Sequence, residues 1–476
     1  MDQLPPPTKR LAVDRLSTVP DPILAEILSL VPTKTAVSTS VLSTRWRSVW
    51  TQITSIHLDY NHFPQHSSDF YTIANNLLLT QLTSPVLRTF YLHAPFRSRQ
   101  HFESWFRHLS ARNVEIIDIN VEDDSKLSDT TSVPPFTIPL CIFQTQSLVC
   151  LNFRPTRLDY VLPVDPHTVV NLPNLKRLGL SLIASQCLFV SKLVSSCPLL
   201  DDFSLTAAQC SCHGHFTFDD DDDDDTGDLI DISCGILKRL ELNTSYMKVK
   251  VLIDTPKLES FSLKGIDVAC CFVKKPIALS EATIITNYPR VVAPIMPVLF
   301  DVRVLQILGT SLHMFEGFKD DKGNLLVFHN LTELNLESST EGVDELIMFR
   351  LKSPSPCLLL KVKKINLVFS SVEYGLNLMK LAHYLLGNAP ALERLSFVLG
   401  PQARQSEDGV KFRLDEMVFC MDLYSCSRES SGCQIEFQGQ YAKVPANIAE
   451  FQDMENQVVL LRESLSPVDA DAVKAS

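Results

Sequence analysis

The sequence predicts an α/β protein in which a small helical module precedes a solenoid built around a mainly parallel sheet. A densely apolar stretch at 14–59 is too short to close a core of its own, and it holds two of the three tryptophans. After residue 50, a six-residue apolar pattern recurs along most of the chain. The 476 residues are 45% hydrophobic and 21% charged, which is a composition that supports a large core.

Helix signals open the chain after a proline-rich segment, 1–13, which we expect to be a disordered tail. Asp21 is expected to cap a first helix, and Pro22 suits its first turn, where no N–H is needed. Pro32 ends that helix, and Thr33 is expected to cap a second one. The sequence therefore predicts at least two short helices in the first 50 residues.

Apolar residues follow these helices at helical spacing. They are Ile23, Leu24, Ile27 and Leu28, then Ala36, Val37, Val41, Leu42, Trp46, Val49 and Trp50. Two interpretations fit the pattern: a helical cap that packs on the next domain, or a module that needs a partner to cover its apolar surface.

The residue order DRLSxxPDxILxxILSxxPTKxAVxTSVLSxRWRxxW closely resembles the F-box, in the form common in plants. The resemblance covers 14–59, and its one small departure is Val19, where the family usually has leucine. It implies a three-helix module that docks on the Skp-family adaptor and, through it, on the cullin and RING protein of a ubiquitin ligase. Transferred by position, the adaptor-binding residues would be Pro20, Ile23, Leu24, Ile27, Leu28, Val41, Leu42, Trp46 and Trp50.

The recurring pattern is apolar–x–x–apolar–x–apolar. Its thirteen copies start at Ile53, Leu87, Val114, Leu148, Leu175, Leu200, Leu237, Leu258, Leu279, Val302, Leu331, Val362 and Leu392. Steps of 21 to 37 residues between copies match leucine-rich repeats, in which the last three positions form a short strand. Alternation along each strand turns one set of side chains inward, and stacked strands share a single core.

These repeats predict a leucine-rich-repeat solenoid at 60–350, a curved sheet with helices or loops on its convex side. An acidic loop insertion is expected at 207–232, and Pro198 and Pro390 are expected to stop return helices before the next strand. The last repeats, 351–400, resemble the FBD segment that ends many plant F-box proteins. We expect a strand and helix region with a loose tail at 401–476.

Candidate chemical sites in the sequence are weak. Cys210, Cys212, His213 and His215 crowd four possible metal ligands into six residues, too close to surround one ion easily. The neighbouring run of seven acids, Asp219–Asp225, lacks the alternation and glycine turn of a calcium loop. Catalytic motifs such as GxSxG, GxGxxG and HExxH are missing from the sequence, so we expect no catalytic residue, no metal and no cofactor.

The net charge, the apolar segments and the cysteine spacing indicate which kinds of partner and compartment to expect. The net charge of −12 becomes −12 + 7 = −5 without the acidic run, which argues against a nucleic-acid partner. Polar residues and prolines break the most apolar window, 291–309, so no membrane span is expected. Thirteen irregularly spaced cysteines fit buried thiols in the cytoplasm or nucleus.

The expected function follows from the two parts: a non-catalytic subunit of an SCF-type E3 ubiquitin ligase that recognises an unknown protein substrate. Outward strand positions are the candidate substrate surface. The alternative is that these side chains are only exposed to water and contact no substrate. They are Arg177, Ser181, Arg239, Glu241, Asn243, Ser262, Lys264, Glu333, Asn335 and Glu337. Two alternatives stay open: a non-ligase scaffold that binds the adaptor, and a small-molecule sensor that uses the concave repeat face.

Overall fold

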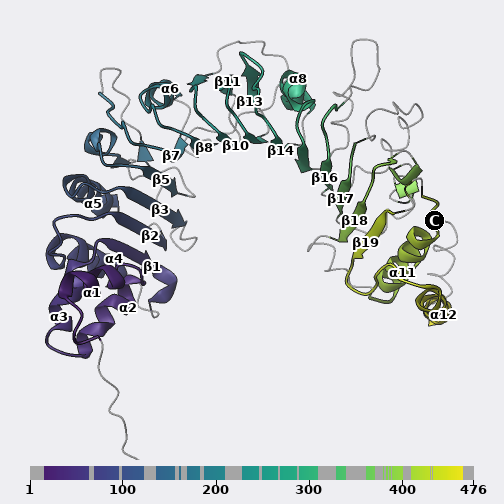
Figure 1. Cartoon of the computed structure of the whole chain (residues 1–476), viewed down its shortest axis with the longest axis horizontal. Coiled ribbons are helices and arrows are strands. Elements are labelled where there is room, and N and C mark those ends of the chain that lie inside the picture. The colour runs from purple at the N-terminus through teal and green to yellow at the C-terminus, as the bar shows by residue number, and fades with distance from the viewer. Residues whose placement is uncertain are drawn as a thin grey trace, which may run out of the picture. The chain divides into compact units, whose positions relative to one another are not determined.

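The computed structural model divides into two compact units, unit 1 (Met1–Ser181) and unit 2 (Leu182–Ser476), which we treat separately (Figure 1). It describes residues 16–63, 69–95, 99–122, 136–155, 160–161, 169–182, 187–208, 228–245, 249–265, 268–286, 289–308, 328–338, 361–369, 379, 382–383, 385–387, 389–399, 409–428, 430 and 432–464.

Unit 1 begins with short helices and continues as a parallel sheet. The helices are α1 (Asp21–Leu28), α2 (Thr33–Ser38), η1 (Thr39–Val41), α3 (Trp46–Val49), η2 (Trp50–Gln52), η3 (Tyr60–His62), α4 (Asp69–Asn76), η4 (Leu77–Gln81), α5 (Arg99–Ala111) and η5 (Leu140–Gln144). The sheet has the order β1 (Ser55–Asp59), β2 (Thr89–Pro95), β3 (Ile116–Glu122), β5 (Cys150–Pro155) and β7 (Arg177–Leu182). Two short strands, β4 (Phe136–Thr137) and β6 (Tyr160–Val161), pair separately.

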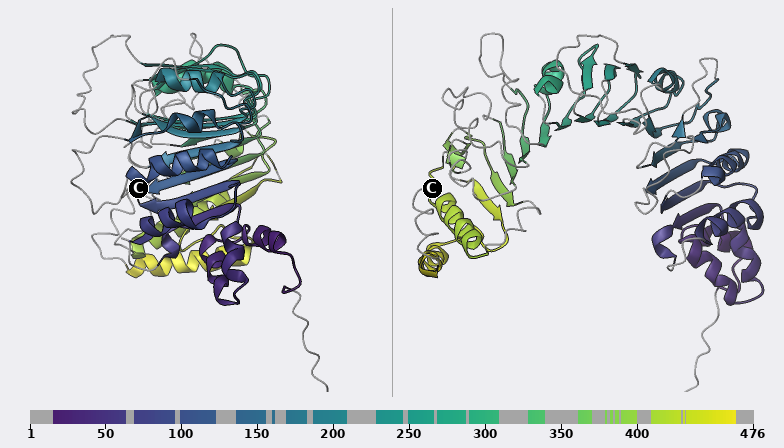
Figure 2. Two further views of the ribbon diagram at one scale, coloured as in Figure 1. Left: turned by 90° about the vertical axis from the view of Figure 1, so that its left-hand side faces the viewer. Right: turned by 180° about the vertical axis from the view of Figure 1, so that it is seen from behind.

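The core of unit 1 lies between the sheet and its return helices. Leu58, Leu92, Ile119 and Phe153 occupy the same register position on four neighbouring strands, and all are buried. The helices α4 and α5 cover this face of the sheet (Figures 1 and 2). Trp105 of α5 is buried there, where it packs against aromatic side chains of α4 and β2. Stacking lets strands that could not bury a face alone share one core.

Unit 2 repeats the arrangement with more strands. Its main sheet has the order β8 (Asp202–Ala208), β10 (Arg239–Ser245), β12 (Ser260–Gly265), β14 (Glu281–Ile285), β15 (Val304–Leu308), β16 (Glu333–Ser338), β17 (Lys364–Phe369), β18 (Arg394–Leu399) and β19 (Gln434–Gln438). The helices are α6 (Cys187–Ser195), α7 (Pro289–Val292), η7 (Ala293–Ile295), α8 (Met296–Leu299), α11 (Gly409–Ser425) and α12 (Ile448–Ser464). All pairings in this sheet are parallel.

Extended return segments form a second sheet in unit 2, where helices or loops were expected. The strands β9 (Asp228–Ser233), β11 (Val249–Asp254) and β13 (Val268–Phe272) pair in parallel. Ile230, Ile232, Val251 and Ile253 are buried and alternate with more exposed residues, which is the period of a strand. The repeats starting at Leu237 and Leu258 are only 21 residues long, so a return helix has little room.

The predicted fold class is confirmed: a helical N-terminal region precedes a long all-parallel sheet with helices. Each of the thirteen hexapeptides leads into a strand, and β19 adds a fourteenth strand that the pattern missed. In the repeat that contains β19, Gly432 stands at the first apolar position of the hexapeptide, where the preceding repeat has Leu392. The apolar pattern is therefore incomplete in this repeat. The helix α12 continues to Ser464, inside the region 401–476 for which strand, helix and a loose tail were expected.

Candidate functional site

Arg45 holds the start of α1 in place. Its Nε donates to the Asp21 carboxylate at 2.6 Å, its Nη1 donates to the Ser17 carbonyl at 2.9 Å, and its Nη2 donates to the Val19 carbonyl. The prediction that Asp21 caps α1 was wrong, because Pro20 occupies the N-cap without a side-chain hydrogen bond and Asp21 pairs with Arg45. The planar guanidinium can reach all three acceptors at once.

Replacing Arg45 with lysine should therefore lower the stability of unit 1 by about 1 kcal/mol, because an ammonium group cannot hold three spread acceptors and the site is partly exposed. All three tryptophans (residues 46, 50 and 105) lie in unit 1, so a urea titration followed by tryptophan fluorescence reports on this unit. Arg47→Lys, at an exposed neighbouring position, is the matched control and should leave the midpoint unchanged. Equal midpoints for the two variants would contradict the role given to Arg45.

Several aliphatic side chains of the helical module are exposed. Ile23 and Ile27 of α1 are 53% and 46% exposed, and Val41 and Leu42 after α2 are 84% and 65% exposed. Leu30, which the sequence prediction omitted, is 83% exposed. We call these five residues the apolar patch. Exposed aliphatic groups gathered in one short module mark a surface that another protein can cover.

The nine predicted adaptor-binding residues separate into two groups. Pro20 and the four patch members among them are exposed, and Trp46 is half-buried. Leu24, Leu28 and Trp50 are buried inside unit 1, at 0%, 5% and 9% exposure. A partner could reach the first group directly, whereas these three support the module from within.

Two hydroxyl groups attach the module to the edge of the sheet. Ser29 Oγ accepts the backbone N–H of Thr54 at 2.9 Å, and Thr33 Oγ1 accepts the N–H of His57 in β1 at 2.8 Å. The prediction that Thr33 caps α2 was wrong, because Pro32 is the N-cap and no side-chain bond caps the helix. The strand β1 is the outermost strand of the sheet, so these bonds satisfy donors on an otherwise open edge.

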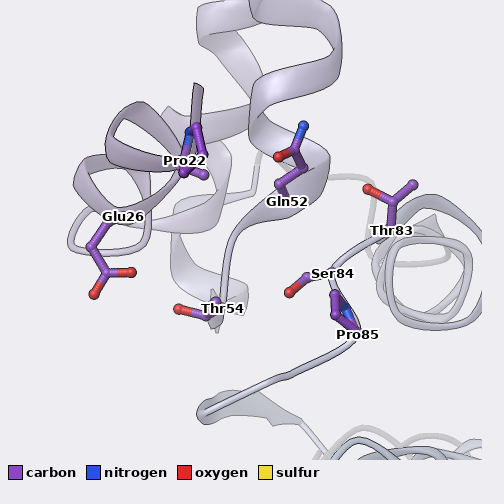
Figure 3. A pocket seen from close by; sticks show the side chains of 8 residues that line it. Pro22, Glu26, Gln52, Thr54, Thr83, Ser84 and Pro85 are labelled. Carbon is purple, nitrogen blue, oxygen red and sulfur yellow. The ribbon is translucent and has the colours of Figure 1, made fainter. Parts of the chain in front are cut away.

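A small pocket of about 360 Å³ lies between α1 and the loop before β2 (Figure 3). Its lining residues are Pro22, Ala25, Glu26, Gln52, Thr54, Thr83, Ser84 and Pro85. Glu26 accepts a hydrogen bond from Arg88, at 3.2 Å, next to this pocket. The pocket has short polar side chains and a single carboxylate, which favours a simple junction between module and repeats over a ligand site.

The open face of the sheet, opposite the core, presents most of the predicted substrate positions in unit 2. Arg239 and Glu241 are exposed and bind neighbouring residues of β8: Arg239 Nε donates to Asp202 at 3.0 Å, and Ser204 Oγ donates to Glu241 at 3.0 Å. Lys264 and Glu337 are also exposed, whereas Asn243, Ser262, Glu333 and Asn335 are half-buried. In unit 1, Arg177 is exposed, whereas Ser181, which alternates with the core residue Leu180 as expected, is only 2% exposed and so is not accessible to a substrate.

Sequence reasoning missed other residues on this face of unit 2. Asn366 donates to the Asn335 side chain across β16 and β17, and Ser396 donates to Glu436 at 3.4 Å across β18 and β19. The half-buried Val304 lies at an outward register position on β15, beside Glu281 and Glu333. The register of the repeats could have identified Asn366, Ser396 and Val304, because each occupies the same strand position as a predicted residue, but not Glu436, whose strand lacks the hexapeptide.

A cysteine and a histidine meet in unit 2, although no such pair was predicted. The Cys426 sulfur lies 3.7 Å from His383 Nε2 and also donates to the Asp422 carbonyl at 3.4 Å. Burial raises the pKa of the Cys426 thiol, and the Asp422 carboxylate raises it further. An activated nucleophile needs the opposite shift, so this pair has the chemistry of a packed thiol.

The sequence predicts neither a metal site nor a membrane span, and the described part of the chain bears on both. No three His, Cys, Asp or Glu residues there are grouped to hold a metal ion. The Cys210–His215 cluster and the Asp219–Asp225 run lie outside the described residues. None of the described helices combines the length and the apolar character needed to cross a membrane. Seven cysteines of the described residues are buried, and burial raises the pKa of Cys197 and of Cys270 to about 12.

Comparison with known proteins identifies the N-terminal module and its relatives. The F-box domain family matches residues 16–56. One putative F-box/FBD/LRR-repeat protein of Arabidopsis thaliana is 30% identical over 200 residues, which is 42% of this chain and 42% of that protein. A second is 24% identical over 464 residues, covering 89% of this chain and 99% of the relative. An F-box/FBD/LRR-repeat protein of the same species is 24% identical, with 89% and 96% covered. The chain therefore carries an F-box domain and is a homologue of plant F-box/FBD/LRR-repeat proteins over most of its length.

Proposed function

We propose that this chain is the substrate-recognition subunit of an SCF-type cullin–RING ubiquitin ligase. The F-box binds a Skp-family adaptor, and the open face of the repeats binds a protein substrate, the client. The observation that carries the proposal is the apolar patch, which lies within the matched residues 16–56 and is exposed in the isolated chain. Burying such a patch against a partner removes apolar surface from water.

The mechanism needs no catalytic residue in this chain. Holding the client near a ubiquitin-loaded enzyme raises the local concentration of its lysines, so transfer becomes effectively intramolecular. The hydroxyl bonds of Ser29 and Thr33 to the first repeat support this role, because they fix the adaptor-binding module to the sheet of unit 1. A segment that resembles FBD, at 351–400, would add repeat structure rather than chemistry.

Changing Ile23 and Ile27 to serine together should weaken adaptor binding at least tenfold, because each substitution replaces an exposed aliphatic contact with a hydroxyl group. The measurement is the affinity of the purified full chain for a purified Skp-family adaptor. Tryptophan fluorescence in urea should show little change in stability, since both side chains are about half exposed. Ile73→Ser is the matched control, because Ile73 lies on α4 of the same unit with 45% exposure.

Unchanged adaptor affinity in the variant with both Ile23 and Ile27 replaced would contradict the assignment of the apolar patch as the adaptor-binding surface. Reconstitution with adaptor, cullin and RING protein then separates a ligase subunit from a scaffold. A ligase subunit should co-migrate with all three, whereas a scaffold would retain the adaptor and exclude the cullin.

A further inference from the structure

The first three strands of unit 1 carry their own set of side chains on the open face of the sheet. Nine of the positions on β1, β2 and β3 that alternate with core residues are Ser55, His57, Asp59, Thr89, Tyr91, His93, Ile116, Asp118 and Asn120. Two are carboxylates, one is a tyrosine, and none is lysine or arginine. The nearby Arg88, just before β2, pairs with Glu26. We call these nine positions the acidic aromatic face.

A polar row crosses the middle of this face. His57, Tyr91, Asp118 and Asn152 occupy one register position on β1, β2, β3 and β5. The rings of His57 and Tyr91 lie side by side, with centroids 5.9 Å apart and planes inclined by 30°. Asn152 Nδ2 donates to Asp118 Oδ2 at 3.4 Å, which orients the Asp118 carboxylate beside β2, the strand that carries Tyr91. An aromatic ring therefore has an oriented carboxylate on the adjacent strand.

A second carboxylate lies one register step further along. Asp59 Oδ1 accepts the backbone N–H of Asn61 at 2.9 Å and lies 3.2 Å from His93 Nδ1. Burial alone would raise the pKa of Asp59, but these hydrogen bonds and the charges of His93 and His62 outweigh it and lower the pKa overall. Asp59 is thus held as a carboxylate at neutral pH.

Both carboxylates act on the same phenol. Burial raises the pKa of Tyr91, and the charges of Asp118 and Asp59 raise it further. Burial also lowers the pKa of His57, so that ring is neutral at pH 7. The charges of His93 and His62 act on Asp59, with which His93 pairs, and leave the charge of Asp118 beside the Tyr91 ring. The acidic aromatic face therefore combines a negative potential with an accessible aromatic ring.

We infer that the acidic aromatic face binds a cationic side chain of the client, an arginine or a lysine, over the Tyr91 ring and between Asp59 and Asp118. A cation over an aromatic ring is attracted by its quadrupole, and carboxylates at the rim add charge-assisted hydrogen bonds. This inference depends on the proposed function only for the statement that the bound protein is a ubiquitination client. The rival interpretation is that these side chains are merely exposed to water and bind no partner.

The test begins with a display library of random 12-residue peptides, selected on the purified full chain in complex with its adaptor. Peptides bound by this face should be enriched in arginine or lysine at one position. A selected peptide is then compared with copies in which citrulline replaces that arginine or acetyl-lysine replaces that lysine. Loss of the charge should weaken binding about tenfold or more, and the two arms show which cation is preferred.

Variants of the chain make the test specific to this face. Asp118→Asn and Tyr91→Leu should each lower the affinity for the selected peptide at least fivefold. Tyr91→Phe should retain most of the affinity because the aromatic ring remains. Glu103→Gln is the matched control, since it removes an exposed carboxylate from α5 in the same unit. Circular dichroism checks that each variant is folded.

The inference is overturned if the library yields no binders, if selected peptides lack a basic position, or if Asp118→Asn binds them as the parent does. Adaptor affinity is measured on the same samples. Lost adaptor binding with intact peptide recognition would defeat the proposed function and leave this recognition standing. The reverse result would defeat the recognition alone.

Discussion

Replacing Leu24 with alanine is expected to lower the free energy of unfolding of unit 1 by about 3 kcal/mol, because its side chain is completely buried and the change leaves a cavity. Adaptor binding should fall as a consequence of the lost fold. Urea unfolding followed by tryptophan fluorescence measures the loss, since every tryptophan of the chain is in unit 1.

Ile27→Ala is the matched comparison, because Ile27 lies on the same helix, three residues later, and is 46% exposed. It should reduce adaptor affinity while changing the unfolding free energy by less than about 1 kcal/mol. Similar stability losses at both positions would mean that α1 does not have the inner and outer faces described here. The comparison also warns against testing adaptor contacts with Leu24 variants, since a folding defect would imitate a binding defect.

The apolar stripe predicted for the first helix contained both Leu24 and Ile27, but helical spacing alone could not show which of the two is buried. Ile23, Leu24, Ile27 and Leu28 form a single apolar run, and the side of it that becomes buried depends on β1 and the first repeat. Those contacts come from residues outside the stripe, so local spacing says nothing about them. The same reason explains the wrong helix caps: Asp21 and Thr33 find partners 24 residues away, in Arg45 and the His57 N–H.

The repeats were easier to predict, because each strand carries its own signal. Alternating apolar residues specify a strand at all thirteen sites, and stacking then specifies the parallel sheet. The open face was only half predictable. Register places Tyr91 beside Asp118, but the raised pKa of Tyr91 also depends on its burial and on the charge of Asp59, which lies outside the hexapeptides.

Glu416 gives the other large expected effect. This glutamate of α11 is completely buried, and its carboxylate accepts three backbone N–H groups, from Gln440 at 3.0 Å, Tyr441 at 2.7 Å and Ala442 at 3.0 Å. These amides belong to the loop after β19, so one side chain ties α11 to the end of the sheet. A Cβ added at Gly439 would come within 2.7 Å of Glu416 Oε2, which shows how closely the loop wraps the carboxylate.

Glu416→Gln should destabilise the C-terminal part of unit 2 by about 3 kcal/mol, because an amide group presents N–H donors where only acceptors fit. Hydrogen exchange read by mass spectrometry should show faster exchange in peptides that cover 440–442. Glu455→Gln, at an exposed position on α12, is the control and should leave that exchange unchanged. The packing of Leu414 and Met417 of α11 against Val458 of α12 lies beside this loop, so loosening it should also increase exchange in α12. Parent-like exchange at 440–442 in Glu416→Gln would mean that packing, and not the buried carboxylate, closes this end of the sheet.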